Sequence, residues 1–125
     1  MDSSAIVKLA VREAESAALR RHLRQRRSLV SSALARTEVL RALLPGGEAA
    51  LVRGRHVLAT IGLVRVNERI LNAAGALLPA ELRSLDAIHL ATATQLGGDI
   101  SQVVTYDERL ANAATRLGFK VASPA

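Results

Sequence analysis

The sequence has no cysteine, and this absence limits the kinds of site that it can form. Without thiols there are no disulfides, no Cys-ligated zinc, no iron–sulfur clusters and no thiol nucleophile, so a metal would need oxygen or imidazole ligands. The only histidines are His22, His56 and His89, which are scattered and have no partner four residues away. We interpret His22 and His56 as surface residues and expect carboxylates to be the ligands of any metal.

Aromatic residues and long apolar runs are scarce as well. Tyr106 and Phe119 account for the 2% aromatic content, so the base-stacking platforms of many single-strand binders are missing. No run of about 18 apolar residues is present, and the start lacks a basic segment followed by an apolar core. We therefore expect a soluble, cytoplasmic protein with no membrane partner.

What the sequence does contain indicates one compact domain over residues 1–125, because half of the residues are hydrophobic and only three are proline. A net charge of +6 favours a polyanionic partner, since basic side chains displace counterions from phosphates. Acidic proteins and solvent-exposed helix faces account for the same charge equally well. The basic side chains cluster in two groups, Arg20, Arg21, Arg24, Arg26 and Arg27 in one stretch and Arg53 with Arg55 in another.

Proline and glycine turns divide the chain into repeated strand-then-helix units. Helices are predicted over residues 5–27, 33–44, 48–60, 68–78, 82–96 and 108–117. Short strands are predicted over residues 28–32, 63–66, 102–105 and 119–122. Alternation of this kind predicts an α/β fold with a parallel sheet, whose ligand sites lie beyond the carboxyl ends of the strands.

Asp86 stands in an almost entirely apolar segment, residues 85–93, which contains no Lys or Arg. A helix that is apolar all round is buried. An ionised carboxylate there is costly unless a metal, hydrogen bonds or a raised pKa compensates. The alternative is that Asp86 lies in the first turn of its helix, where negative charge suits the helix dipole and Arg83 is close enough in sequence to pair with it.

Asp2 and Asp107 each precede a predicted helix, and Asp107 also follows a predicted strand. Each is therefore either a helix N-cap or a ligand at the carboxyl end of a strand. Ser3 and Ser4 are further candidates for the cap at the first helix.

Glu38 lies in a helix whose main apolar stripe is predicted on Val39, Leu40, Leu43 and Leu44. This periodicity predicts a solvent-exposed Glu38 on the opposite side.

No single acid is decisive, but a parallel sheet would gather four acids that stand near the starts of helices. Gathered carboxylates repel one another and need a cation. Mg²⁺ prefers oxygen ligands and keeps several waters, which suits carboxylates facing a phosphate backbone. The expected chemistry is hydrolysis of a phosphodiester bond.

The opening segment, residues 2–9, resembles the first motif of PIN-domain nucleases, in particular of VapC-type toxins. The later motifs keep the order of that family, and the resemblance covers essentially the whole chain. Glu38 in residues 35–39, Asp86 in residues 85–93 and Asp107 in residues 104–110 are similar to its second, third and fourth acids, and residues 118–121 look like its final strand.

The resemblance implies a three-layer PIN-like domain with a central parallel sheet of order 3-2-1-4-5 flanked by helices. It also implies Mg²⁺ or Mn²⁺ bound by Asp2, Glu38, Asp86 and Asp107, endonucleolytic cleavage of RNA, a homodimer and a cognate antitoxin. Ser4 and Thr105 match positions that support the acidic site. The alternative is a catalytically weak PIN-like module that binds RNA or a protein partner.

Two further expectations concern His89 and the start of the chain. His89, three residues after Asp86, is interpreted as a packed helix residue rather than a base. Family members have several apolar residues before the first acid, which form the central strand, whereas only Met1 precedes Asp2 here. We therefore expect a truncated first strand, with either a start further upstream in the natural protein, a start at an internal Met, or neighbouring strands that close up.

Overall fold

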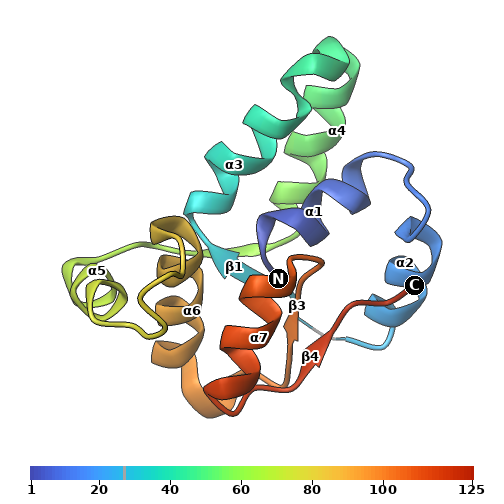
Figure 1. Ribbon diagram of the computed structural model, residues 1–125. Coiled ribbons are helices and arrows are strands. Elements are labelled where there is room, and N and C mark those ends of the chain that lie inside the picture. The colour runs from blue at the N-terminus through green and yellow to red at the C-terminus, as the bar shows by residue number, and fades with distance from the viewer. Residues whose placement is uncertain (27) are drawn as a thin grey trace.

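The computed structural model describes residues 1–26 and 28–125 and shows short parallel strands among helices (Figure 1). The N-terminal part contains α1 (Ser3–Ala10), α2 (Ser16–Leu23), β1 (Val30–Ser32), α3 (Leu34–Leu43), the 3-10 turn η1 (Leu44–Gly46) and α4 (Gly47–Ala59). The remainder contains β2 (Gly62–Val64), α5 (Glu68–Gly75), α6 (Ser84–Leu96), η2 (Gly97–Asp99), β3 (Val103–Val104), α7 (Glu108–Arg116) and β4 (Val121–Ala122). No helix within the described ranges has the length and apolar character to cross a membrane.

The strands form two separate parallel pairs, and the start of the chain lies between them. β1 pairs with β2, and β3 pairs with β4. The Met1 ammonium donates to the Val30 carbonyl at 2.8 Å, and the Asp2 N–H donates to the Val104 carbonyl at 3.2 Å. The predicted strands are confirmed in position, although all are shorter than expected. Within residues 1–26 and 28–125 the strands do not form one continuous sheet, because Met1 and Asp2 offer too few backbone groups to pair with both neighbouring strands.

The predicted helices are confirmed except the first, which is broken into α1 and α2. Val11 is extended, with φ −123° and ψ 154°, so the helix ends there. The Ser16 hydroxyl donates to the Lys8 carbonyl at 2.7 Å and accepts the Glu13 N–H at 2.9 Å, which holds the turn together. The break folds α2 back so that Leu19 joins the buried cluster around α1, whereas one continuous helix would carry it away. Local helix propensity is overridden here by tertiary packing.

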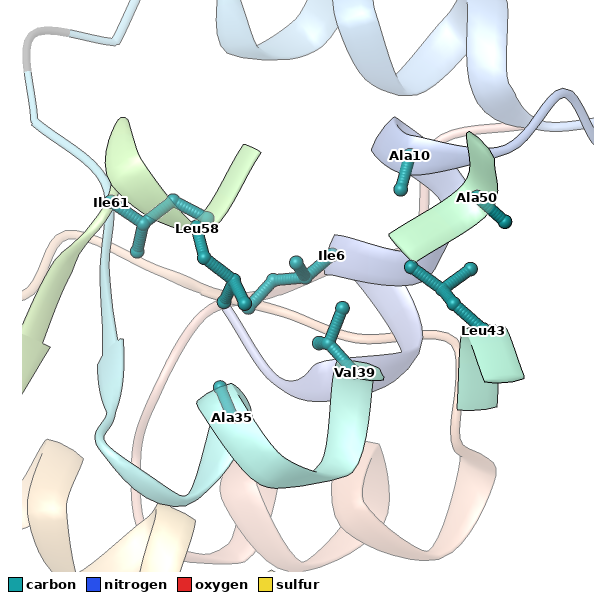
Figure 2. Packing of buried hydrophobic residues seen from close by; sticks show 8 residues of the cluster. All are labelled: Ile6, Ala10, Ala35, Val39, Leu43, Ala50, Leu58 and Ile61. Carbon is teal, nitrogen blue, oxygen red and sulfur yellow. The ribbon is translucent and has the colours of Figure 1, made fainter. Parts of the chain in front are cut away.

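The largest buried cluster joins α1 to the hairpin of α3 and α4 (Figure 2). Ile6 and Val39 are fully buried where α1 meets α3. Gly54 of α4 lies so close to α3 that an added Cβ would stand 2.5 Å from Leu43 Cδ1, so a larger residue there would force the Leu43 side chain to shift. The packing fixes α1, and with it Asp2, relative to α3.

Helix α6 is covered on both sides, as its apolar sequence predicted. Ala87 and Ala91 pack against Ile70 of α5, and Leu90 packs against Leu110 of α7. In Figure 1, α6 lies between α5 and α7. The first turn of α6, which carries Asp86, is therefore fixed between two neighbouring helices.

A mainly apolar cavity remains beneath the residues that separate the two strand pairs. Its lining includes Met1, Val30, Leu90 and Val103. The Ser31 hydroxyl also lines this cavity, and it is buried without a hydrogen-bond partner in the described part of the chain. Burial lowers the pKa of the Met1 ammonium, because the charged form loses its hydration.

We expect a short engineered Val/Ile extension before Met1 to raise the melting temperature by roughly 5 °C or more. The extension would pair with the free edges of β1 and β3, bury apolar side chains and replace the buried ammonium with an amide. Differential scanning calorimetry measures the change, and a Gly/Ser extension of equal length is the control. Equal melting temperatures for the two extensions would contradict this account of the cavity.

Candidate functional site

Four carboxylates from four separate segments line one pocket of about 340 Å³. Asp2 caps α1, Asp107 caps α7, Asp86 lies in the first turn of α6, and Glu38 projects from α3. The remaining lining residues are Ser3, Ser4, Arg83, Ser84, Leu85 and His89. The structure thus brings all four predicted acids to the same pocket.

Asp2 is buried and has both carboxylate oxygens hydrogen-bonded. Oδ1 accepts from the Ser4 hydroxyl at 2.7 Å and from the Ala5 N–H at 3.2 Å, while Oδ2 accepts from the Thr105 hydroxyl at 2.7 Å. Ser4 also accepts the Tyr106 N–H at 3.0 Å, and Thr105 accepts the Asp107 N–H at 3.0 Å. The two hydroxyls therefore tie Asp2 to the segment that positions Asp107.

Glu38 is only partly exposed, so the predicted solvent-facing orientation is wrong. Its side chain is 25% exposed, and Oε1 accepts from the Ser3 hydroxyl at 2.7 Å and lies 2.6 Å from His89 Nε2. The buried face of α3 consists of Ala35, Val39 and Leu43, whereas Leu44 is 49% exposed. Packing against α1 and α4 turns the helix away from the orientation that the apolar stripe alone predicted.

Two opposing effects act on the pKa of Glu38. Burial raises it, but the hydrogen bonds from His89 and Ser3 outweigh burial and hold the pKa below its ordinary value. Glu38 is therefore kept ionised with Oε1 directed at His89 and Ser3. Its other oxygen, Oε2, accepts no hydrogen bond from the described residues.

Asp86 carries a charge that its surroundings do not compensate. Burial raises its pKa, and the negative charges of Asp107, Asp2 and Glu38 add to this effect, while His89 opposes it. Neither of its carboxylate oxygens forms a hydrogen bond or ion pair within residues 1–26 and 28–125. The alternative of a pair with Arg83 is therefore wrong for this structure, because the exposed Arg83 lines the pocket without an ion pair or hydrogen bond to Asp86 among the described residues.

Asp107 serves as a helix cap and also lines the pocket. Its Oδ1 accepts the N–H groups of Arg109 at 2.9 Å and Leu110 at 3.1 Å. No hydrogen bond from the described part of the chain reaches Oδ2. The predicted cap is thus confirmed and uses Oδ1, and the predicted ligand role, which would be left to Oδ2, stays a prediction.

His89 and Ser3 are site residues whose contacts sequence reasoning missed. The interpretation of His89 as a packed helix residue is confirmed, since it is 9% exposed. Its bond to Glu38 joins α6 to α3 across 51 residues of sequence, a distance that no local pattern reports. The sequence offered one sign that His89 belongs to the site: it stands three residues after Asp86, a spacing that places both side chains on one face of the helix.

The two basic clusters and the remaining histidines are not among the described residues that line the acidic pocket. Arg53 donates to the Ala10 carbonyl at 3.0 Å, and Arg55 pairs with Glu48 at 3.4 Å. His56 is exposed as predicted, but His22 is partly buried against Gln102, so that prediction is wrong. In the first cluster, Arg20, Arg21, Arg24 and Arg26 are exposed, and Arg27 falls outside the described residues.

The donor set of the pocket suits a hard divalent cation. In the described arrangement no three His, Asp or Glu side chains are close enough together to hold one ion. The oxygens without hydrogen bonds nevertheless belong to carboxylates, and the repulsion that raises the pKa of Asp86 is the kind that a cation relieves. Mg²⁺ takes oxygen ligands and retains several waters, so it requires few direct protein contacts.

Comparison with protein families matches residues 1–116 to the PIN domain. Among curated relatives, the chain is 61% identical over 124 residues to Ribonuclease VapC46 of Mycobacterium tuberculosis (strain ATCC 25618 / H37Rv), covering 99% of this chain and 95% of that protein. It is 37% identical over 129 residues to Ribonuclease VapC47 of Mycobacterium tuberculosis (strain CDC 1551 / Oshkosh), with the same shares covered.

A solved structure has the same overall arrangement. The crystal structure of Mycobacterium tuberculosis VapC20, described as a Sarcin-Ricin loop cleaving toxin, matches with a TM-score of 0.78 at 17% identity and covers 98% of this chain and 97% of that one. This likeness shows a shared α/β fold with parallel strands among helices. The chain belongs to the PIN-domain family and, within it, to the VapC ribonucleases.

Proposed function

We propose that the protein is a metal-dependent endoribonuclease that hydrolyses RNA phosphodiester bonds and acts as the toxin of a toxin–antitoxin pair. The observation that carries the proposal is Asp86, an acid without a hydrogen-bond partner in the described structure whose pKa is raised by burial and by three neighbouring acids. The ribonuclease names of the relatives support the same activity.

Mg²⁺ or Mn²⁺ is the cofactor that this donor set fits. Asp86 and Glu38 each have an oxygen free to bind it, Asp107 would bind it directly or through water, and Asp2 is the fourth acid. Bound metal would activate a water, orient the phosphate and stabilise charge on the leaving oxygen.

The protein side chains act by positioning and by charge. Ser4 and Thr105 hold both oxygens of Asp2, and His89 holds Glu38. Arg83, the one Lys or Arg among the described residues that line the pocket, supplies a guanidinium for a phosphate oxygen of the substrate. The carboxylates alone would repel RNA, and the positive charge of Arg83 reduces this repulsion as the RNA enters the pocket.

Residues 1–125 would form one PIN domain in which Met1 and Asp2 take the place of the middle strand, a proposal supported by their backbone hydrogen bonds to Val30 of β1 and Val104 of β3. If Met1 and Asp2 are counted as strand 1, then β1, β2, β3 and β4 become strands 2, 3, 4 and 5, and the strand order is 3-2-1-4-5. By its membership of the VapC branch, the protein acts in the cytoplasm as a homodimer and is neutralised by a cognate antitoxin.

A second candidate is a catalytically weak PIN-like module that binds RNA or a protein. It is favoured by the spacing of the acids, since no described trio is close enough to hold one ion. RNA cleavage assays with Mg²⁺ or Mn²⁺, and with EDTA as a control, distinguish the two candidates. A complete absence of cleavage by a stably folded protein would favour the module.

Replacing Asp86 with Asn should lower RNA cleavage by about 100-fold or more, since even residues behind metal ligands cost about 10–100-fold. Gel-based cleavage of a labelled RNA measures the change. Asp99→Asn is the matched control, because Asp99 is an exposed acid outside the pocket and undergoes the same chemical change. Cleavage that persists in Asp86→Asn or in EDTA would point to a contaminating nuclease.

In EDTA, Asp86→Asn should melt at a higher temperature than the unaltered protein. The pKa of Asp86 is raised in the fold, so its ionised form destabilises the fold at neutral pH and Asn removes that cost. The cost is fully present above the raised pKa and disappears below the ordinary value of 3.8, so the difference should vanish in strong acid. A lower melting temperature for Asp86→Asn at neutral pH would contradict the described environment.

His89→Asn should reduce cleavage by about 10–100-fold and raise the Mg²⁺ concentration needed for half-maximal rate. His89→Gln should retain most activity, because its amide nitrogen reaches the position of Nε2, whereas the amide of Asn is too short to bond Glu38. Steady-state cleavage over a range of Mg²⁺ concentrations tests both, with His56→Asn as the exposed control. Equal activity of the Asn and Gln variants would exclude a positioning role.

A further inference from the structure

A groove lies along α7, and its lining residues are close in sequence to residues that line the acidic pocket. One wall is the segment before α6, with Pro79, Glu81 and Leu82, and the other is α7, with Arg109, Asn112 and Arg116. Neither arginine takes part in the acidic pocket or in the packing of the core.

The two segments that line the groove also contribute residues to the acidic pocket. The segment 79–86 lines the groove with its first residues and the acidic pocket from Arg83 onward. Helix α7 likewise contributes Asp107 to the pocket and Arg109, two residues later, to the groove. Figure 1 shows α7 beside α6. Asp107 is the N-cap of α7. A linear polymer with its centre in the pocket would therefore continue into the groove.

The arginines of the groove have no acidic partner. Arg109 and Arg116 are exposed and form no ion pair within the described part of the chain, whereas Arg55 pairs with its neighbour Glu48. They stand seven residues apart, with Asn112 between them, so all three share one face of α7 over about 10 Å. Glu81 is the one acid among the groove residues. The surface thus changes from negative in the pocket to positive along α7.

We propose that this groove holds the sugar–phosphate backbone of single-stranded RNA on one side of the bond that is cut, with Arg109 and Arg116 contacting different phosphates. The inference rests on the proposed function, because it takes the acidic pocket as the cleavage site. Guanidinium groups match phosphate oxygens in pairs, and Asn112 offers a further donor. The lining contains no aromatic residue for base stacking, so the contacts are to the backbone and do not read sequence.

The test compares two double variants that remove the same charge. Arg109→Ser/Arg116→Ser alters the groove, and Arg41→Ser/Arg69→Ser alters exposed arginines of α3 and α5 that line neither the pocket nor the groove. Binding of a fluorescein-labelled single-stranded RNA of about 12 nucleotides is measured by anisotropy with Mg²⁺, in the Asp86→Asn background so that the RNA stays intact. Each measurement is repeated over a range of salt concentrations.

The groove variant should bind the RNA about tenfold or more weakly, and its slope of log affinity against log salt should become shallower by about 1.4, or about 0.7 for each lost phosphate contact. With Asp86 intact, KM for this RNA should rise while kcat is kept, and cleavage of a dinucleotide, too short to reach the groove, should be unchanged. The control variant should keep the slope of the unaltered protein.

Equal losses in the two double variants would overturn the proposal, because the effect would then be one of overall charge. So would loss of dinucleotide cleavage in the groove variant, which would place the arginines in the pocket or in folding. Both results leave the proposed function intact, provided that the unaltered protein cleaves RNA. If the unaltered protein neither cleaves nor binds RNA, the proposed function fails and this inference fails with it.

Discussion

The carboxylate of Asp2 is the junction on which the arrangement of the site depends. The backbone N–H of Asp2 donates to Val104 of β3, and the neighbouring Met1 ammonium donates to Val30 of β1. The carboxylate of Asp2 accepts hydrogen bonds from Ser4, Ala5 and Thr105. In the described structure, the two strand pairs have no backbone ladder between them, so these bonds connect the edge at β1 with the edge at β3. A buried carboxylate that accepts three hydrogen bonds is compensated locally, and it holds together segments that lie about 100 residues apart in sequence.

The other three acids show how one pocket gives similar groups different states. Glu38 is kept ionised by His89 and Ser3, whereas Asp86 has no such donors and bears the repulsion of its neighbours. Asp107 divides its two oxygens between the α7 cap and the pocket. The uncompensated negative charge is thus concentrated on Asp86, whereas the other three acids accept hydrogen bonds from the protein.

If the protein cleaves RNA as proposed, the charges around the pocket suit a long anionic substrate better than a small one. A cation among carboxylates would attract one phosphate, but a polymer also needs favourable contacts on either side of that point. Arg83 lines the pocket, and the exposed Arg109 and Arg116 line the groove along α7. Charge on the protein surface that follows a groove steers and aligns a polyanion more effectively than the same charge scattered over the surface.

The sequence by itself determined the positions of most helices, the buried character of α6 and the identity of the four acids. These features depend on local chemistry, such as the capping oxygens of Asp2 and Asp107 or the unbroken apolar run around Asp86, and on motifs that keep a family order. Tertiary structure decided the break at Val11, the inward turn of Glu38 and the separation of Arg83 from Asp86. It also decided the bond between His89 and Glu38 and the division of the strands into two pairs. The orientation of Glu38, its bond to His89 and the pairing of the strands depend on contacts between segments distant in sequence, and neither helix propensity nor periodicity carries information about which distant side chain will lie opposite.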